Sequence, residues 1–299
     1  MGSITIQGSG FGLYGYLPAI IDYGYDSLLL DIKKREFLEK RNELIPFIEK
    51  IIWVDSIKSI FETVDSVVIA VPPNHQPNLV YSLLNFKNIK NLHLEKPLGK
   101  NPDDSEKLSN FLYQNDYKWH VNYSFIYSNW FDDFKEKFSR LDNLDQLKII
   151  WKFKSFQLRN KVFNWKTQFH SGGGPLNFYG IHLVALLAYF GYEDIIYSSI
   201  NKSIWIATFL GDNIPNCKIF IDIDSDEETF AIDREIGLSK KINLINFKNP
   251  FINESIIENQ DIRCSLLKKF LYKSDMNNLL NYSFEKKVNN LWIKAIASY

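Results

Sequence analysis

The first hundred residues alternate short apolar segments with segments of helical composition, and this alternation restricts the fold more than any other feature of the chain. The apolar segments cover residues 3–7, 27–31, 51–54, 65–72 and 92–94. Helical composition is clearest at residues 34–49 and 77–85. Strands that alternate with helices form right-handed βαβ units around a parallel sheet. The sequence therefore predicts an α/β protein whose amino-terminal part holds a parallel sheet.

The pattern changes after a helix expected at residues 102–114 and a strand expected at residues 119–123. Leu147, Ile149 and Trp151 then share one face of a strand, with lysines on the other face. Similar alternation marks residues 203–210, 218–224 and 241–247. Strands with one polar face are typical of an antiparallel or mixed sheet that is covered on one side only.

An apolar helix at residues 176–190 would supply that cover, and a last helix is expected at residues 284–297. We therefore predict two domains, at residues 1–119 and 120–299 of the 299-residue chain. The second is expected to be an α/β domain with an open, mostly antiparallel sheet.

Composition excludes several classes of function. The 35 basic and 35 acidic residues balance, which argues against nucleic acid as the main partner. The longest apolar run, at residues 183–190, is far shorter than the roughly 20 residues that span a bilayer. Cys217 and Cys264 form neither a disulfide framework nor a zinc ligand set, and no other metal-ligand spacing occurs. We expect a cytoplasmic protein without a metal site.

A glycine-rich turn follows the first apolar segment. It contains Gly8, Gly10 and Gly12, with Phe11 between the last two. Glycines let a backbone turn tightly and approach a pyrophosphate closely. The amino-terminal end of the next helix attracts the negative charge of that pyrophosphate. The usual spacing is G-x-G-x-x-G, but Leu13 occupies the third position here. The turn predicts a dinucleotide site.

The choice between NAD and NADP depends on residues near the second apolar segment. Asp31 ends that segment about 20 residues after the turn, where an acid binds a ribose hydroxyl of NAD. Its carboxylate would repel a 2′-phosphate, which favours NAD. Lys33, Lys34 and Arg35 follow at once, either as a phosphate-binding cluster that suits NADP or as a solvated helix start.

Three later segments resemble the Gfo/Idh/MocA family of oxidoreductases. They are DSVVIAVPPNHQ at residues 65–76, LEKPL at residues 94–98 and GGGPLNFYGIH at residues 172–182. In the last, the three glycines, Gly180 and His182 match the family pattern. Gln76 stands where the family usually has His, and Phe178 stands where it has Asp.

The resemblance implies a Rossmann domain and a function, namely hydride transfer between NAD or NADP and a carbon of a sugar or sugar nucleotide. His182 would carry the proton and Lys96 would stabilise charge on the reacting oxygen. The implied cofactor contacts are Gly8, Gly10, Phe11, Gly12, Asp31, Pro72, Asn74, Glu95 and Lys96. Possible substrate contacts are Lys166, His170, Asn177 and Tyr179. The resemblance also implies a homo-oligomer formed through the open sheet.

Phe178 leaves alternatives to this function. A phenyl ring accepts no hydrogen bond, so a polyol substrate loses an anchor that the family Asp would supply. The substrate then differs, or the reaction differs, as in reduction of an imine. The third alternative is a catalytically silent scaffold or sensor that still binds a dinucleotide. Asn177 is the nearest hydrogen-bonding substitute, although a helical neighbour points ~100° away.

Overall fold

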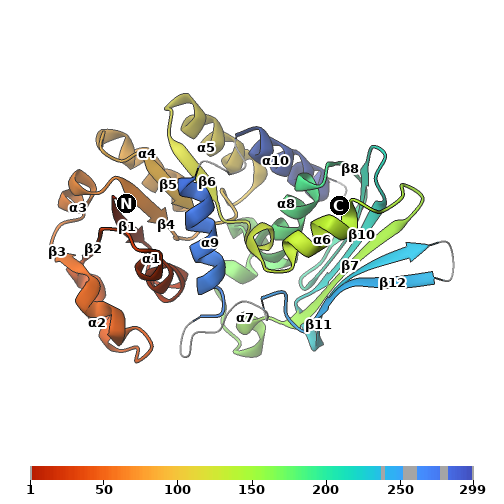
Figure 1. Ribbon diagram of the computed structural model, residues 1–299, viewed down its shortest axis with the longest axis horizontal. Helices are drawn as coiled ribbons and strands as arrows, with labels where there is room; N and C mark the ends of the chain where they lie inside the picture. Colours follow the sequence, from red (N-terminus) through yellow and green to blue (C-terminus); the bar gives the residue numbers. More distant parts are fainter. Residues whose placement is uncertain (1, 237–239, 252–260, 277–281, 298–299) are drawn as a thin grey trace. The chain divides into compact units, whose positions relative to one another are not determined.

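The computed structural model describes residues 2–236, 240–251, 261–276 and 282–297, and its ribbon is drawn in Figure 1. The chain divides into two compact units. The first combines the described parts of residues 1–99, 107–127 and 254–281. The second combines those of residues 100–106, 128–253 and 282–299. Each unit is assembled from separate stretches of chain, whereas the sequence suggested the consecutive ranges 1–119 and 120–299.

The first unit is built on a six-stranded sheet in the order β3-β2-β1-β4-β5-β6. The strands are β1 (Ser3–Gln7), β2 (Ser27–Asp31), β3 (Ile52–Val54), β4 (Ser66–Ile69), β5 (Asn91–Leu94) and β6 (Lys118–Val121). All neighbouring pairs are parallel, which confirms the predicted Rossmann sheet. The strand order reverses between β1 and β4, where ligands of doubly wound folds bind at the carboxyl ends of the strands.

Helices and helical turns lie between these strands and after the last of them. They are η1 (Gly12–Tyr16), α1 (Leu17–Tyr23), η2 (Ile32–Lys34), α2 (Arg35–Glu39), η3 (Ile45–Lys50), α3 (Ile57–Thr63), α4 (Gln76–Ser82), η4 (Leu83–Asn85), α5 (Pro102–Gln114, whose first residues belong to the second unit), η5 (Ser124–Tyr127) and α9 (Cys264–Asp275). The expectation of one helix over residues 34–49 is wrong. The segment breaks into α2 and η3 because Pro46, which lacks an amide hydrogen, fits the first turn of a helix but not its interior.

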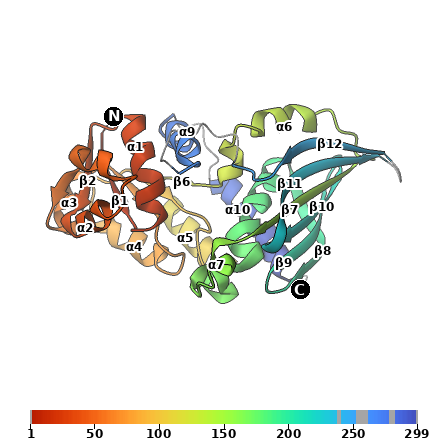
Figure 2. The ribbon, with the colours of Figure 1, turned by 90° about the horizontal axis from the view of Figure 1, so that it is seen from below.

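Helix α9 comes from the carboxyl-terminal part of the chain, yet it packs against α1 (Figure 1, Figure 2). At its start, the Cys264 Sγ lies 3.4 Å from the Gly15 carbonyl oxygen. Further along, Lys268 Nζ lies 2.7 Å from Asp22 Oδ2. At its end, the Tyr23 hydroxyl donates to Asp275 Oδ2 at 2.9 Å. The two helices therefore run parallel, with their amino-terminal ends on the same side.

The second unit is built on a six-stranded sheet in the order β12-β11-β7-β10-β9-β8. The strands are β7 (Gln146–Lys154), β8 (Tyr192–Ile200), β9 (Ile204–Gly211), β10 (Asn216–Asp222), β11 (Asp224–Ile236) and β12 (Lys240–Phe247). The β7–β10 pair is parallel and the other described pairs are antiparallel, which confirms the expected sheet. Strands β8 and β11 were not among the strands expected from the sequence.

The helical segments of this unit are α6 (Phe131–Phe138), α7 (Phe156–Arg159), η6 (Trp165–Thr167), η7 (Phe169–Ser171), η8 (Pro175–Gly180), α8 (Ile181–Tyr189) and α10 (Tyr282–Ala297). The expected helix at residues 176–190 is present as η8 followed by α8. Trp205 and Trp292 are fully buried on the covered side of the sheet. No helix within the described ranges has the length and apolarity that crossing a membrane requires.

Candidate cofactor and substrate site

The three glycines of the turn after β1 meet different surroundings. Gly8 has a φ of +134°, and a Cβ there would lie 2.4 Å from the Ala70 carbonyl oxygen. A Cβ on Gly12 would lie 3.0 Å from Ile6 and 3.2 Å from Ala70. Around Gly10, in contrast, no atom lies within 4 Å of such a Cβ. The turn is thus packed on β1 and β4 at two glycines and open at the third, which suits the approach of a pyrophosphate.

The departure from the usual glycine spacing has a packing explanation. Leu13, at the third position of the pattern, is fully buried. Gly15 instead receives the ring of Phe11, because a Cβ on Gly15 would lie 2.4 Å from that ring. Phe11 therefore folds back over its own helix.

Asp31 lies at the carboxyl end of β2 and is 9% exposed. Its Oδ1 accepts a hydrogen bond from the Lys33 amide at 2.9 Å. Lys34 donates from Nζ to the Ile6 carbonyl oxygen, and burial lowers the pKa of Lys34 to about 8. Arg35 pairs with Glu39 at 2.8 Å. Two of the three basic side chains after β2 therefore have partners within the unit.

The proline turn after β4 leads into a buried anchor. The Pro72 carbonyl oxygen accepts from the His75 and Gln76 amides, at 2.9 and 3.2 Å. Asn74 is exposed. The Gln76 side chain is fully buried and donates to the carbonyl oxygens of Glu95 and Leu98, at 3.0 and 2.9 Å. Gln76 thus holds the turn after β5. The sequence marked this position only as one where the resembled family usually has His.

Glu95 begins the turn after β5. Its Oε1 accepts from the Tyr16 hydroxyl at 2.6 Å and from the Asn122 amide at 2.8 Å. Burial raises the pKa of Glu95, and the charges of Lys96 and Arg263 oppose that shift. Burial also raises the pKa of Tyr16 well above its ordinary value.

Tyr16 and Asn122 were not among the predicted site residues. Lys96 follows Glu95 directly and is joined to Pro97 by a cis peptide bond.

The glycine motif of the second unit is close-packed at Gly173 and Gly180. A Cβ on Gly173 would lie 2.2 Å from the Trp165 carbonyl oxygen. One on Gly180 would lie 2.6 Å from the Trp205 ring. His182 is in the first turn of α8 and is 5% exposed. These close approaches explain why the motif uses glycine, and they fix the backbone before His182.

The Phe178 side chain packs among aromatic rings and beside a lysine. Its ring centroid is 5.2 Å from that of Trp165, edge to face, and 5.2 Å from Lys166 Nζ. An ammonium over an aromatic face is a cation–π contact. Where the resembled family has Asp, this chain thus has Phe178, whose ring makes a cation–π contact with Lys166.

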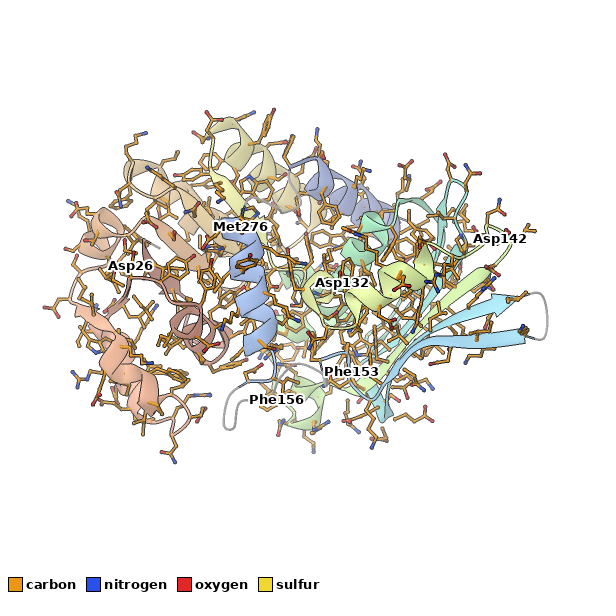
Figure 3. All side chains as sticks on the ribbon, in the orientation of Figure 1. Asp26, Asp132, Asp142, Phe153, Phe156 and Met276 are labelled. Carbon is orange, nitrogen blue, oxygen red and sulfur yellow. The ribbon has the colours of Figure 1, made fainter. Side chains whose placement is uncertain are left out.

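The neighbouring predicted residues have mixed surroundings. Tyr179 packs its ring 5.0 Å from Phe153, which Figure 3 labels, and its hydroxyl donates to Gln157 Oε1 at 3.3 Å. Asn177 is 2% exposed, donates to the Phe169 carbonyl oxygen at 3.0 Å and accepts from Trp292 Nε1 at 2.9 Å.

Both groups of the Asn177 amide therefore bond within the protein, which gives Asn177 an anchoring role; its predicted contact with substrate stays a prediction. His170 is exposed.

No protein-family model matches the sequence, and no curated protein matches it. Solved structures with similar folds exist. The WlbA (WbpB) dehydrogenase from Thermus thermophilus, in complex with NAD and UDP-GlcNAcA, has a TM-score of 0.72 at 13% identity and covers 100% of this chain and 95% of its own. The fold is that of the WlbA dehydrogenases.

Two further structures agree. WlbA from Bordetella pertussis, in complex with NADH and UDP-GlcNAcA, has a TM-score of 0.74 at 11% identity and covers 100% of this chain and 97% of its own. UDP-N-acetylglucosamine 3-dehydrogenase GnnA from Acidithiobacillus ferrooxidans has a TM-score of 0.65 at 10% identity, with coverage of 99% and 98%. These likenesses confirm the predicted resemblance at the level of the fold.

In the first unit, the WlbA-like fold gathers most predicted cofactor residues at one sheet edge. Asp31 is the last residue of β2, and the glycine turn, Pro72 and the Glu95-Lys96 pair follow the carboxyl ends of other parallel strands. In the second unit, Lys166, Phe178 and Tyr179 lie together, with His182 one helical turn further on. The described residues hold no group of three His, Cys, Asp or Glu side chains placed to bind a metal.

Proposed function

We propose that the protein is an NAD(P)-dependent oxidoreductase that transfers a hydride to or from a carbon of a sugar or sugar nucleotide. The observation that carries the proposal is the turn after β1, which is packed at Gly8 and open at Gly10. It lies on the same sheet edge as Glu95 and Lys96. Dehydrogenase structures of similar fold, in complex with UDP-GlcNAcA and either NAD or NADH, support this function.

NAD is the favoured cofactor. The open backbone at Gly10 and the start of the following helix suit a pyrophosphate, so the residues present fit the group. The Asp31 carboxylate suits a ribose hydroxyl and repels a 2′-phosphate. When bound, the nicotinamide supplies or accepts the hydride.

Lys96 and His182 are the proposed catalytic residues. An alkoxide forms when a carbinol loses its proton, and the Lys96 ammonium stabilises that negative charge. His182 takes the proton in oxidation and returns it in reduction. Lys166 and Tyr179 are the proposed substrate contacts, with exposed His170 as a further one.

Turnover of a panel of sugar nucleotides with NAD tests this proposal. We expect Lys96→Met and His182→Asn each to lower kcat by roughly 100-fold, the lower end of the range for general acid–base catalysis. The Kd for NADH should change little in the His182 variant. The surface variant Lys58→Met, whose native side chain pairs with Glu62, serves as the matched control. Full turnover in both site variants would show that the assignment is wrong.

Phe178 favours a second candidate, a dinucleotide-binding scaffold or sensor, because its ring replaces the carboxylate of the resembled family and contacts Lys166. That candidate predicts tight NADH binding without turnover of any substrate in the panel. Reduction of an imine in place of a ketosugar would instead favour the non-sugar reductase.

We also infer assembly through the open sheet and a cytoplasmic location. Both cysteines are unpaired and buried, which is typical of proteins from a reducing compartment. A small-molecule substrate is the only partner that the proposed reaction requires.

A further inference from the structure

We propose that Arg263, at the start of α9, is a positioning residue that holds the glycine turn ready for the dinucleotide. This inference rests on the proposed function, because it concerns the same cofactor site. Nothing in the sequence motifs pointed to Arg263, which lies some 250 residues after the turn.

The contact that carries the inference joins Arg263 to Phe11. The guanidinium carbon of Arg263 lies 4.1 Å from the centroid of the Phe11 ring. Phe11 separates Gly10 from Gly12 in the turn. An Arg that stacks on a ring at this distance makes a cation–π contact worth ~0.5–2 kcal/mol, depending on how far it is desolvated.

Phe11 is also held on its other sides. A Cβ on Gly15 would lie 2.4 Å from the ring, so the ring rests directly on the helix backbone. Tyr14 and Tyr16 meet it edge to face, at 5.6 and 5.5 Å between ring centroids. The guanidinium therefore adds to the contacts that hold the half-buried Phe11 ring. Because Gly10 and Gly12 flank Phe11, fixing this ring fixes the backbone on both sides of it.

Arg263 is itself fixed by a carboxylate. Its Nε and Nη2 each donate to an oxygen of Asp261 at 2.8 Å, in a two-bond fork. The Asp261 Oδ1 also accepts the Arg263 backbone amide at 2.9 Å. This geometry holds the guanidinium plane in place, since the fork of Arg matches the two oxygens of a carboxylate.

The test measures the Kd for NADH by fluorescence titration of the full-length protein and its variants. We expect Arg263→Met to raise the Kd about tenfold, from the loss of the cation–π contact. Phe11→Leu should do the same, and the double variant should lose no more than either single variant, because both changes break one stack. Lys268→Met, on the same helix and paired with Asp22, is the control and should keep the wild-type Kd.

The inference would be overturned by a wild-type Kd in Arg263→Met, by additive losses in the double variant, or by an equal loss in the Lys268 control. A merely structural role of Arg263 would lower the Tm of the unliganded protein and leave the Kd at 25 °C unchanged. Arg263→Lys keeps the charge but lacks the planar fork, so a wild-type Kd in that variant would also contradict positioning through the stack. If the wild-type protein binds no NADH, the proposed function fails instead.

Discussion

Gly8 and Gly10 are two positions apart in one turn, and the structure gives them opposite constraints. Gly8 needs its glycine for folding, because its φ is +134° and its Cα approaches the Ala70 carbonyl oxygen. Gly10 has space around it, so the fold itself does not require glycine at this position. The sequence motif treats the two glycines alike, and only the structure around each one shows the difference.

The first prediction follows from Gly8. We expect Gly8→Ala to lower the free energy of unfolding by at least about 2 kcal/mol, from backbone strain and the clash with Ala70. Urea unfolding measures this change. Gly10→Ala is the matched control and should unfold like the wild type. Equal stability of the Gly8 and Gly10 variants would contradict the packing described for the turn.

Sequence reasoning about single residues depends on motifs and does not reach partners that are distant along the chain. Glu95 and Lys96 were proposed from their motif, and they remain predictions. Tyr16 and Asn122, which hold the Glu95 carboxylate, gave no signal, since neither lies near it in sequence. Asn177 was expected at substrate, yet its amide bonds to Phe169 and Trp292. Trp292 comes from α10, and such long-range pairing is invisible in a local pattern.

At the scale of elements, β1 and β2 match the predicted ranges to the residue, because short β-branched or leucine-rich runs in a parallel sheet are bounded sharply by polar turns. Helix α5 also matches the expected range, and Asn101 caps its start, with the Asn101 Oδ1 accepting the Asp104 amide at 2.8 Å. Helix α9 was missed, although its partner α1 was expected. Its place in the first unit follows from tertiary packing alone.

Two strands beside α9 carry a stability prediction. His93 on β5 and His120 on β6 are register partners. His93 Nδ1 lies 3.1 Å from Ser274 Oγ of α9, whereas neither ring nitrogen of His120 has a hydrogen-bond partner in the described part of the chain. Burial lowers the pKa of His93 to about 3 and of His120 to about 4.

Both folded-state pKa values lie below the ordinary histidine value near 6.5. Between about pH 4 and 6.5 the unfolded chain therefore binds more protons than the folded one, and stability falls as the pH falls through that range. We expect the urea midpoint to drop from pH 7 to pH 5. His120→Phe should reduce that drop and add about 1 kcal/mol at pH 7, because unpaired buried nitrogens are removed. An unchanged pH slope in this variant would show that His120 does not contribute.

At the scale of the whole molecule, the sequence predicted a parallel sheet and a mostly antiparallel sheet, and both are present. It did not predict that each unit is assembled from separate stretches. The reason is that α9 and α10 follow one another near the end of the chain but belong to different units. Helical periodicity identifies a helix. It does not show which unit the helix belongs to, because that depends on which apolar surface the helix covers.

Assembly through the open face of the second sheet gives a prediction at this scale. That face carries ion pairs between β7 and β11, with Lys152 Nζ 2.7 Å from Glu227 and Lys154 Nζ 2.8 Å from Asp226. On β8, Ile196 and Tyr197 are 62% and 51% exposed. We expect sedimentation to show an oligomer, and Ile196→Asp to weaken it if β8 contributes to the interface. A monomer at all concentrations would contradict the proposal.

The central claim is that the first unit binds a nicotinamide dinucleotide at the turn around Gly10. Fluorescence titration with NADH of the wild type and of Gly10→Val tests it most directly, because the valine occupies space that no atom of the protein fills. The claim predicts saturable wild-type binding with a Kd on the order of micromolar to millimolar, near the usual range for enzyme ligands. It predicts loss of that binding in Gly10→Val with an unchanged Tm. Absence of wild-type binding to both NADH and NADPH, or equal binding by the valine variant, would contradict it.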